Sequence, residues 1–151
     1  MSSGFSIKVS ATGIGEVIIK LRGARARMED LTPAMKQGAV MMLRSVDQNF
    51  RQSGRPIPWK PLKFATLKRK LRQGYSPLPL TRTGALRRSI TQKTFRQKFQ
   101  LGTSIKYGAV HQFGGGNNIP ARPYLVFQRQ DVKRINKLVL EYIAGGKVRL
   151  G

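Results

Sequence analysis

The stretch TPAMKQGAVMMLRSVDQNF, residues 32–50, predicts the clearest helix of the chain. Thr32 suits the N-cap and Pro33 suits the first helical position, where its missing N–H leaves no hydrogen bond unmade. The apolar side chains of this stretch recur at helical spacing and form one stripe: Met35, Ala39, Met42, Leu43, Val46 and Phe50. We expect this stripe to face the core and the helix to end near Ser53-Gly54.

The two ends of the chain supply further elements. Phe5, Ile7 and Val9 alternate with polar residues, which predicts a short strand. Over residues 14–31 the apolar positions fall mostly at helical spacing, whereas the β-branched run at 17–19 favours a strand, so both interpretations stay open. A last helix is expected over 131–144, ending at Gly145-Gly146. Its apolar face comprises Val132, Ile135, Leu138, Val139 and Tyr142.

The middle of the chain breaks the helical pattern. Three prolines within 55–61 forbid a helix and favour an extended surface segment. A short basic helix over 62–72 and a mobile loop over 74–79 follow. Strand-like segments come next at 90–95, 99–103, 107–113 and 124–127, with a glycine-rich loop at 114–118. We predict an α+β fold in which an antiparallel sheet of about four strands packs against two to three helices.

A chain of 151 residues normally forms one domain, so we expect a single domain over 1–151. Its parts are the N-terminal strand and helices (1–54), the basic proline-rich segment and helix (55–79), the β-meander (83–127) and the C-terminal helix (130–144). The chain contains no cysteine, which excludes disulfide scaffolds and thiol nucleophiles. Its first ten residues lack the apolar core of a signal peptide, and no apolar run approaches a membrane span, so we expect synthesis in the cytoplasm and no membrane partner.

The charge is extreme and unevenly distributed. Lys and Arg total 29 against 6 Asp and Glu, a formal net charge of +23. Residues 48–130 hold 17 of the basic residues and none of the acidic ones. An exposed, solvated basic face is the ordinary explanation of a short charge run, but a carboxylate-free stretch of this length favours an anionic partner.

Catalytic motifs are missing from the sequence. His111 is the only histidine, and no metal-ligand spacing or phosphate-binding loop is present. His111 is expected to pack or to form a hydrogen bond, and we predict no enzymatic activity, no metal and no cofactor. Trp59, Phe64 and Tyr75 alternate with basic residues, which suits stacking on nucleic-acid bases, but we favour Trp59 as an anchor that holds the proline-rich segment on the core.

A series of motifs runs in order along the chain. Ile57-Pro-Trp-Lys-Pro-Leu62 precedes Thr66-Leu-Lys68, followed by Leu80-Thr-Arg-Thr-Gly-Ala-Leu86 with Ser89-Ile90. Leu101-Gly-Thr103, Tyr107-Gly-Ala-Val-His-Gln-Phe-Gly114 and Ile119-Pro-Ala-Arg-Pro-Tyr124 complete the series. The series resembles the Mu-like phage virion morphogenesis family, whose members are also described as tail completion proteins, over nearly the whole chain. Two departures stand out: Gly108 where alanine is usual after the tyrosine, and Tyr124 where phenylalanine is usual.

The resemblance implies a structural protein at the head-proximal end of a phage tail, located in the neck of the virion. It also implies a ring of copies, expected to be a hexamer, with the genome passing through its centre. The implied partners are further copies of the chain, neighbouring neck or connector proteins, tail terminator or tail tube proteins, and genomic DNA bound through nonspecific electrostatics.

Two sets of site residues follow. The residues expected to face DNA or form an interface are Lys60, Lys63, Lys68, Arg69, Lys70, Arg72, Arg87, Arg88 and Arg122. The residues expected to build the motifs are Trp59, Thr83, Gly84, Leu86, Tyr107, His111, Gln112, Gly114, Pro120 and Pro123. Within them, Thr83 should cap a turn, Gly84 should allow a tight backbone, and Leu86 should enter the core.

Two other functions compete with this one. A monomeric, basic, sequence-nonspecific nucleic-acid-binding module would explain the charge equally well. A nuclease or other hydrolase would require turnover that disappears on His111→Ala. A stable monomer that binds random DNA would favour the first competitor.

Overall fold

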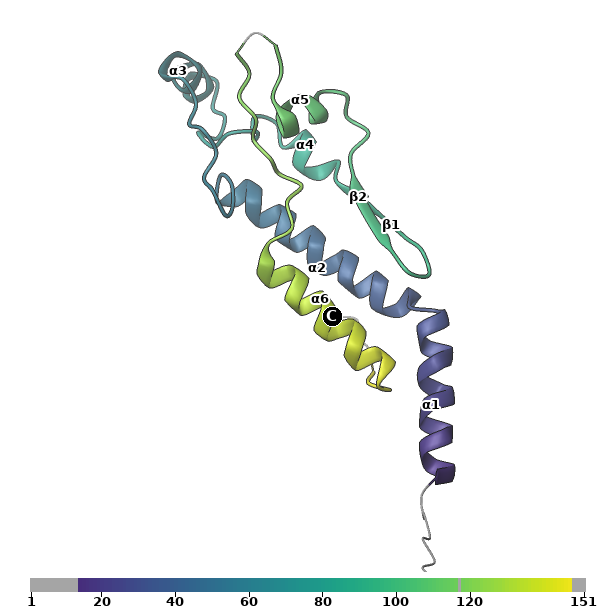
Figure 1. The fold of residues 1–151 in the computed structure, drawn as a ribbon. Helices are drawn as coiled ribbons and strands as arrows, with labels where there is room; N and C mark the ends of the chain where they lie inside the picture. The colour runs from purple at the N-terminus through teal and green to yellow at the C-terminus, as the bar shows by residue number, and fades with distance from the viewer. Residues whose placement is uncertain (1–13, 117, 148–151) are drawn as a thin grey trace, which may run out of the picture.

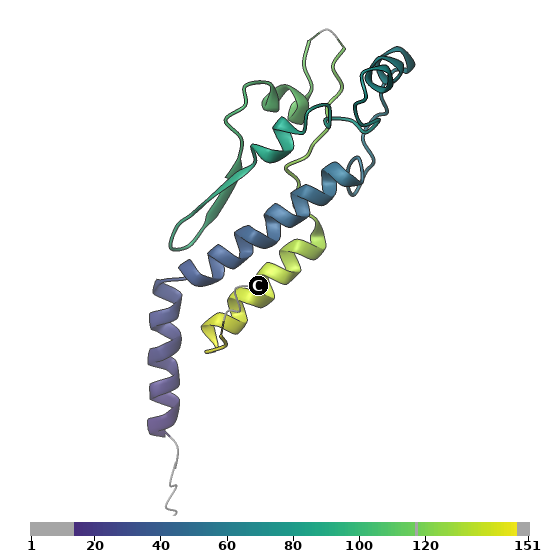
Figure 2. The ribbon, with the colours of Figure 1, turned by 180° about the vertical axis from the view of Figure 1, so that it is seen from behind.

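The computed structural model describes residues 14–116 and 118–147, so the strand expected at residues 5–9 lies outside the described residues. The elements are α1 (Ile14–Glu29), α2 (Thr32–Arg51), α3 (Phe64–Arg72), α4 (Ala85–Arg88), β1 (Thr91–Thr94), β2 (Phe99–Gly102), α5 (Tyr107–Phe113) and α6 (Arg129–Ile143). Helix α2 lies between α6 on one side and the β1–β2 hairpin on the other (Figure 1). Helices α3, α4 and α5 gather at one end of α2, and α1 extends from the other end (Figures 1 and 2).

The prediction for α2 is confirmed in its buried stripe, and its bounds agree with the expected ones to within about two residues. Ala34, Met35, Ala39, Met42, Val46 and Phe50 are buried, and Leu43 is half-buried. The N-cap is Leu31 rather than Thr32, because the Thr32 N–H donates to the Asp30 carboxylate at 2.9 Å and the helix starts one residue earlier than expected. The pKa of Asp30 is lowered mainly by a hydrogen bond from the Thr32 side chain and then by this bond from the Thr32 N–H.

Aromatic side chains from three segments form the centre of the core. Phe50 of α2 lies 5.8 Å from the Trp59 ring in an edge-to-face arrangement and 5.4 Å from the Tyr124 ring. Trp59 is buried, and its Nε1 donates to the Pro123 carbonyl at 2.8 Å. Trp59 therefore anchors the proline-rich segment, as predicted, and Leu86 completes the cluster.

A buried polar network joins α2 to α6. Asp131 accepts a hydrogen bond from Ser45 Oγ of α2 and another, at 3.3 Å, from the Gln128 N–H, which closes a capping box at the start of α6. Arg55 donates to Ser45 Oγ at 2.8 Å and to Asn49 Oδ1 at 2.9 Å. Because every member has a partner, these polar groups are buried at little cost.

The prediction of about four strands is wrong for the described residues, which contain two paired strands, β1 and β2, in antiparallel register from Thr91 opposite Gly102 to Thr94 opposite Phe99. Residues 107–113 form α5 instead of a strand. Gly108 and Gln112 are four residues apart, so the helix places both on the same side, where Gly108 is buried and Gln112 is half-buried. Residues 124–127 are irregular, because the N–H groups of Tyr124 and Leu125 both donate to Gln112 Oε1 at 3.0 Å rather than to a neighbouring strand.

Other predictions from the sequence agree with the structure. Residues 17–19 lie in α1, so the helical interpretation of that segment is confirmed. Helix α3 begins at Phe64 and α6 at Arg129, each within two residues of the expected start. Residues 55–61 are not helical, as their prolines require.

Candidate nucleic-acid interface

A cavity of about 580 Å³ opens where α3, α4 and α5 meet. Four basic residues line it, namely Arg69, Lys70, Arg82 and Arg122, and no carboxylate does so within the described part of the chain. Its other lining residues are Leu62, Thr66, Gln73, Leu80, Thr83, Gly84, Ala85, Leu86, Tyr107 and His111. We call this site the basic cavity.

The basic residues of the cavity fall into two pairs. Lys70 and Arg122 are buried and hold backbone carbonyls: Lys70 Nζ donates to Leu78 O at 2.6 Å, and Arg122 Nε donates to Lys60 O at 3.0 Å. Burial lowers the pKa of both, and the charge of Arg82 lowers that of Lys70 further. Arg69 and Arg82 are exposed, with Arg82 stacked over the Tyr75 ring at 5.2 Å.

Arg122 is only 7% exposed, so its side chain turns into the fold instead of projecting from the extended segment 119–123. Its Nη2 also donates to Pro61 O at 3.4 Å, which fixes the two proline-containing segments to each other. In the single chain Arg122 is therefore an intramolecular clamp. Its contact with DNA or with a second subunit stays a prediction.

His111 lies on α5, and Arg122 of the segment 119–123 is close to it. Burial lowers the pKa of His111 first, and the charge of Arg122 lowers it further; both effects favour the neutral imidazole. Its Nδ1 is buried without a hydrogen-bond partner among the described residues, and its ring packs edge-to-face on Tyr107 at 5.7 Å. His111 thus packs as expected, although it lies on a helix and not on a strand.

The other motif residues shape the walls around the cavity. Thr83 Oγ1 accepts from the Ala85 N–H at 3.3 Å, and Gly84 has φ +72°, so the predicted turn cap and tight backbone are confirmed. Leu86 is buried in the core, as predicted. Gly114 ends α5 at φ +84°, where its absent Cβ would lie 3.2 Å from the Ala121 N. Pro120 and Pro123 flank Arg122 in the extended segment.

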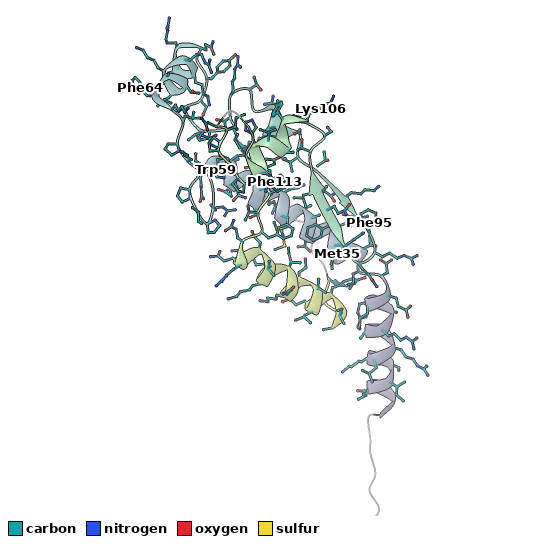
Figure 3. All side chains as sticks on the ribbon, turned by 45° about the horizontal axis from the view of Figure 1, so that its top comes forward. Met35, Trp59, Phe64, Phe95, Lys106 and Phe113 are labelled. Atoms are coloured by element: carbon teal, nitrogen blue, oxygen red, sulfur yellow. The ribbon has the colours of Figure 1, made fainter. Side chains whose placement is uncertain are left out.

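The remaining predicted basic residues lie outside the cavity lining, and all of them except Arg87 are exposed. Lys60, Lys63, Lys68, Arg72 and Arg88 are exposed, most of them on or near α3. Arg87 is half-buried and forms an ion pair with Asp47, which also pairs with Arg51 at 2.7 Å. Figure 3 shows Phe64 on α3 at the periphery and Trp59 near the centre of the fold.

Sequence reasoning missed Arg82 and the buried network of Ser45, Asn49, Arg55 and Asp131. Arg82 stands inside the motif Leu80–Leu86, so its place in the motif was a usable signal. Ser45 and Asn49 are four residues apart beside the apolar stripe of α2, which is the spacing of two inward polar positions on one helical face.

The described residues contain no group of three His, Asp or Glu side chains arranged to hold a metal ion. None of the helices in the described ranges has the length and apolarity to cross a bilayer.

Comparison with known proteins decides the family. A model described as the phage virion morphogenesis family matches residues 14–144, which is most of the chain. The chain belongs to the phage virion morphogenesis family. The chain is also 33% identical over 142 residues to "Mu-like prophage FluMu G protein 2" of Haemophilus influenzae, an alignment that covers 90% of this chain and 95% of the relative. No solved structure matches it.

Gly108 and Tyr124 are close neighbours in the core. A Cβ on Gly108 would lie 2.8 Å from the Tyr124 hydroxyl oxygen and 2.7 Å from Thr103 Cγ2. An alanine at 108 would therefore collide with the hydroxyl of a tyrosine at 124, which a phenylalanine lacks. We expect the residues at 108 and 124 to compensate for each other in part.

Proposed function

We propose that the protein is a tail completion protein that joins head to tail at the head-proximal end of the phage tail. In this proposal copies form a ring, expected to be a hexamer, whose cationic surface contacts the genome as it passes through. The protein is synthesised in the host cytoplasm, becomes part of the virion neck and catalyses no reaction. Its neighbours are neck or connector proteins and tail terminator or tail tube proteins.

The observation that carries the DNA contact is the basic cavity. Four cationic side chains converge with no carboxylate among the described lining residues, so their mutual repulsion favours a bound anion. Lys70 and Arg122 are already held by carbonyls, which leaves exposed Arg69 and Arg82 to reach a phosphate. Phosphate contacts of this kind carry no sequence information, as a passage for a whole genome requires.

We expect the double variant Arg69→Glu/Arg82→Glu to bind a labelled random-sequence duplex about tenfold more weakly than the unaltered chain. The slope of log affinity against log salt should also become shallower by about 1–2, since each lost phosphate contact removes about one unit. Fluorescence polarisation between about 50 and 200 mM salt measures both quantities.

The matched control is Lys133→Glu/Arg134→Glu, which makes the same change in charge at exposed positions of α6 outside the cavity. This control should bind the duplex with an affinity closer to that of the unaltered chain. An equal loss in both double variants would assign binding to net charge alone and would remove the cavity from the proposal. Light scattering on the same samples separates a ring from the competing monomeric nucleic-acid-binding module.

A further inference from the structure

The first half of α1 presents aliphatic side chains to solvent on several sides. Val17, Ile18, Ile19 and Leu21 are between 42% and 70% exposed. Successive residues of a helix are turned by about 100°, so positions 17, 18 and 19 alone span more than half of its circumference. A helix that is apolar on so many sides is normally enclosed by other protein, and a single flat surface cannot cover it.

The other elements that the structure describes do not enclose that half of α1. The contacts that tie α1 to α6 come from its last turn and the residue after it: Arg27 Nε donates to Ile143 O at 2.8 Å, and Tyr142 Oη donates to Asp30 O at 3.2 Å. In both ribbon views the N-terminal half of α1 extends away from the other described elements (Figures 1 and 2).

An apolar groove lies elsewhere on the same chain. It has a volume of about 380 Å³ and forms where α2, β2 and the segment after Tyr124 meet. Its lining residues are Val46, Phe99, Gln100, Leu101, Leu125 and Phe127, none of which is charged. Phe127 is 61% exposed at its edge, so its ring is open to apolar side chains of a partner.

One chain carries both an unpartnered apolar helix and an uncharged apolar groove, so a second copy of this chain is the occupant that supplies the helix for the groove. Two chains of +23 repel each other, and the repulsion is weakest where the contacting parts are neutral. The described first half of α1, residues 14–21, carries one acid, Glu16, and one base, Lys20, and the groove lining carries no charge. Exposed Lys98 and Arg129 stand close in sequence to Phe99 and Phe127, where they can attract Glu16 of the incoming helix.

We infer that α1 of one subunit docks into the groove of the next and so links the subunits head to tail. The two contact surfaces differ, so each subunit offers a free helix on one side and a free groove on the other. Repeating such a contact closes a ring when the rotation between subunits allows it. This inference rests on the proposed ring and names the surfaces that hold it together.

The test uses one variant for each surface. Ile19→Glu/Leu21→Glu places charges on α1 and should prevent it from docking. Phe127→Glu places a charge at the groove and should prevent the groove from receiving α1. Each variant alone should be monomeric by size-exclusion chromatography with light scattering. An equimolar mixture should form a dimer of about twice 16.9 kDa, because one intact helix and one intact groove remain to pair.

The matched control Ile57→Glu/Leu140→Glu alters equally exposed aliphatic residues outside both surfaces and should retain the full assembly. Circular dichroism confirms that each variant is folded.

The outcomes separate this inference from the proposed function. If the unaltered chain assembles and both variants assemble equally well, the ring stands and the α1 contact is wrong. If folded single variants are monomeric but their mixture yields no dimer, the head-to-tail pairing is wrong. If the unaltered chain is monomeric at every concentration, both the ring and this inference fail.

Discussion

Replacing Trp59 with alanine is expected to lower the free energy of unfolding by about 3–5 kcal/mol, the usual cost of truncating a large buried aromatic side chain. The Trp59 ring packs edge-to-face on Phe50, and its Nε1 holds the Pro123 carbonyl. The change therefore opens a cavity in the core and also releases the proline-rich segment. Urea denaturation followed by circular dichroism measures the effect, because Trp59 is the only tryptophan and its fluorescence is lost with it.

The variant Trp59→Phe separates the two contributions. It keeps an aromatic ring against Phe50 but leaves the Pro123 carbonyl without its donor, which should cost about 1–2 kcal/mol. A loss in Trp59→Ala no larger than the loss in Trp59→Phe would show that the ring contributes little. Trp59 would then anchor the proline-rich segment through its Nε1 hydrogen bond alone.

Replacing Gly108 with alanine is expected to destabilise the protein by about 1–3 kcal/mol. The new methyl group would lie 2.8 Å from the Tyr124 hydroxyl oxygen and 2.7 Å from Thr103 Cγ2. Tyr124 is buried at the centre of the core, so its ring has little freedom to move away. The matched control is Gly102→Ala, whose Cβ would meet nothing within 4 Å and which should change stability by less than about 0.5 kcal/mol.

The double variant Gly108→Ala/Tyr124→Phe tests the compensation directly. Removing the hydroxyl relieves one of the two close contacts, so we expect Gly108→Ala to cost at least about 1 kcal/mol less in the Tyr124→Phe background. The remaining contact with Thr103 keeps the rescue incomplete. Additive effects of the two changes would mean that the departures at 108 and 124 are independent.

The sequence was sufficient for the long helices, because their apolar side chains are spaced for one buried face over many turns. Helices α2 and α6 were predictable on this basis. Helix α5 was not, since seven residues rich in small and mixed side chains satisfy a strand pattern as well as a helical one. The irregular segment at 124–127 could not be foreseen either, because it depends on the Gln112 side chain, which takes the N–H groups that a strand would offer to a neighbour.

Most basic residues of the cavity were predictable from the sequence, but Arg82 and the geometry of the site were not. Arg69, Lys70, Arg122 and His111 were all singled out from charge and motif order, and the fold brings them together in the basic cavity. Their division into buried and exposed members was not predictable. It depends on which backbone carbonyls lie within reach of Lys70 and Arg122, and tertiary packing alone determines that.

The central claim is that this chain forms part of the neck and presents its basic cavity to the genome. A cryo-electron microscopy reconstruction of the head–tail joint of the virion tests it most directly. We expect a ring of this chain at the head-proximal end of the tail, with Arg69 and Arg82 facing the DNA in the channel. A mature virion without the chain, or a ring whose cavities face outward away from the DNA, would contradict it.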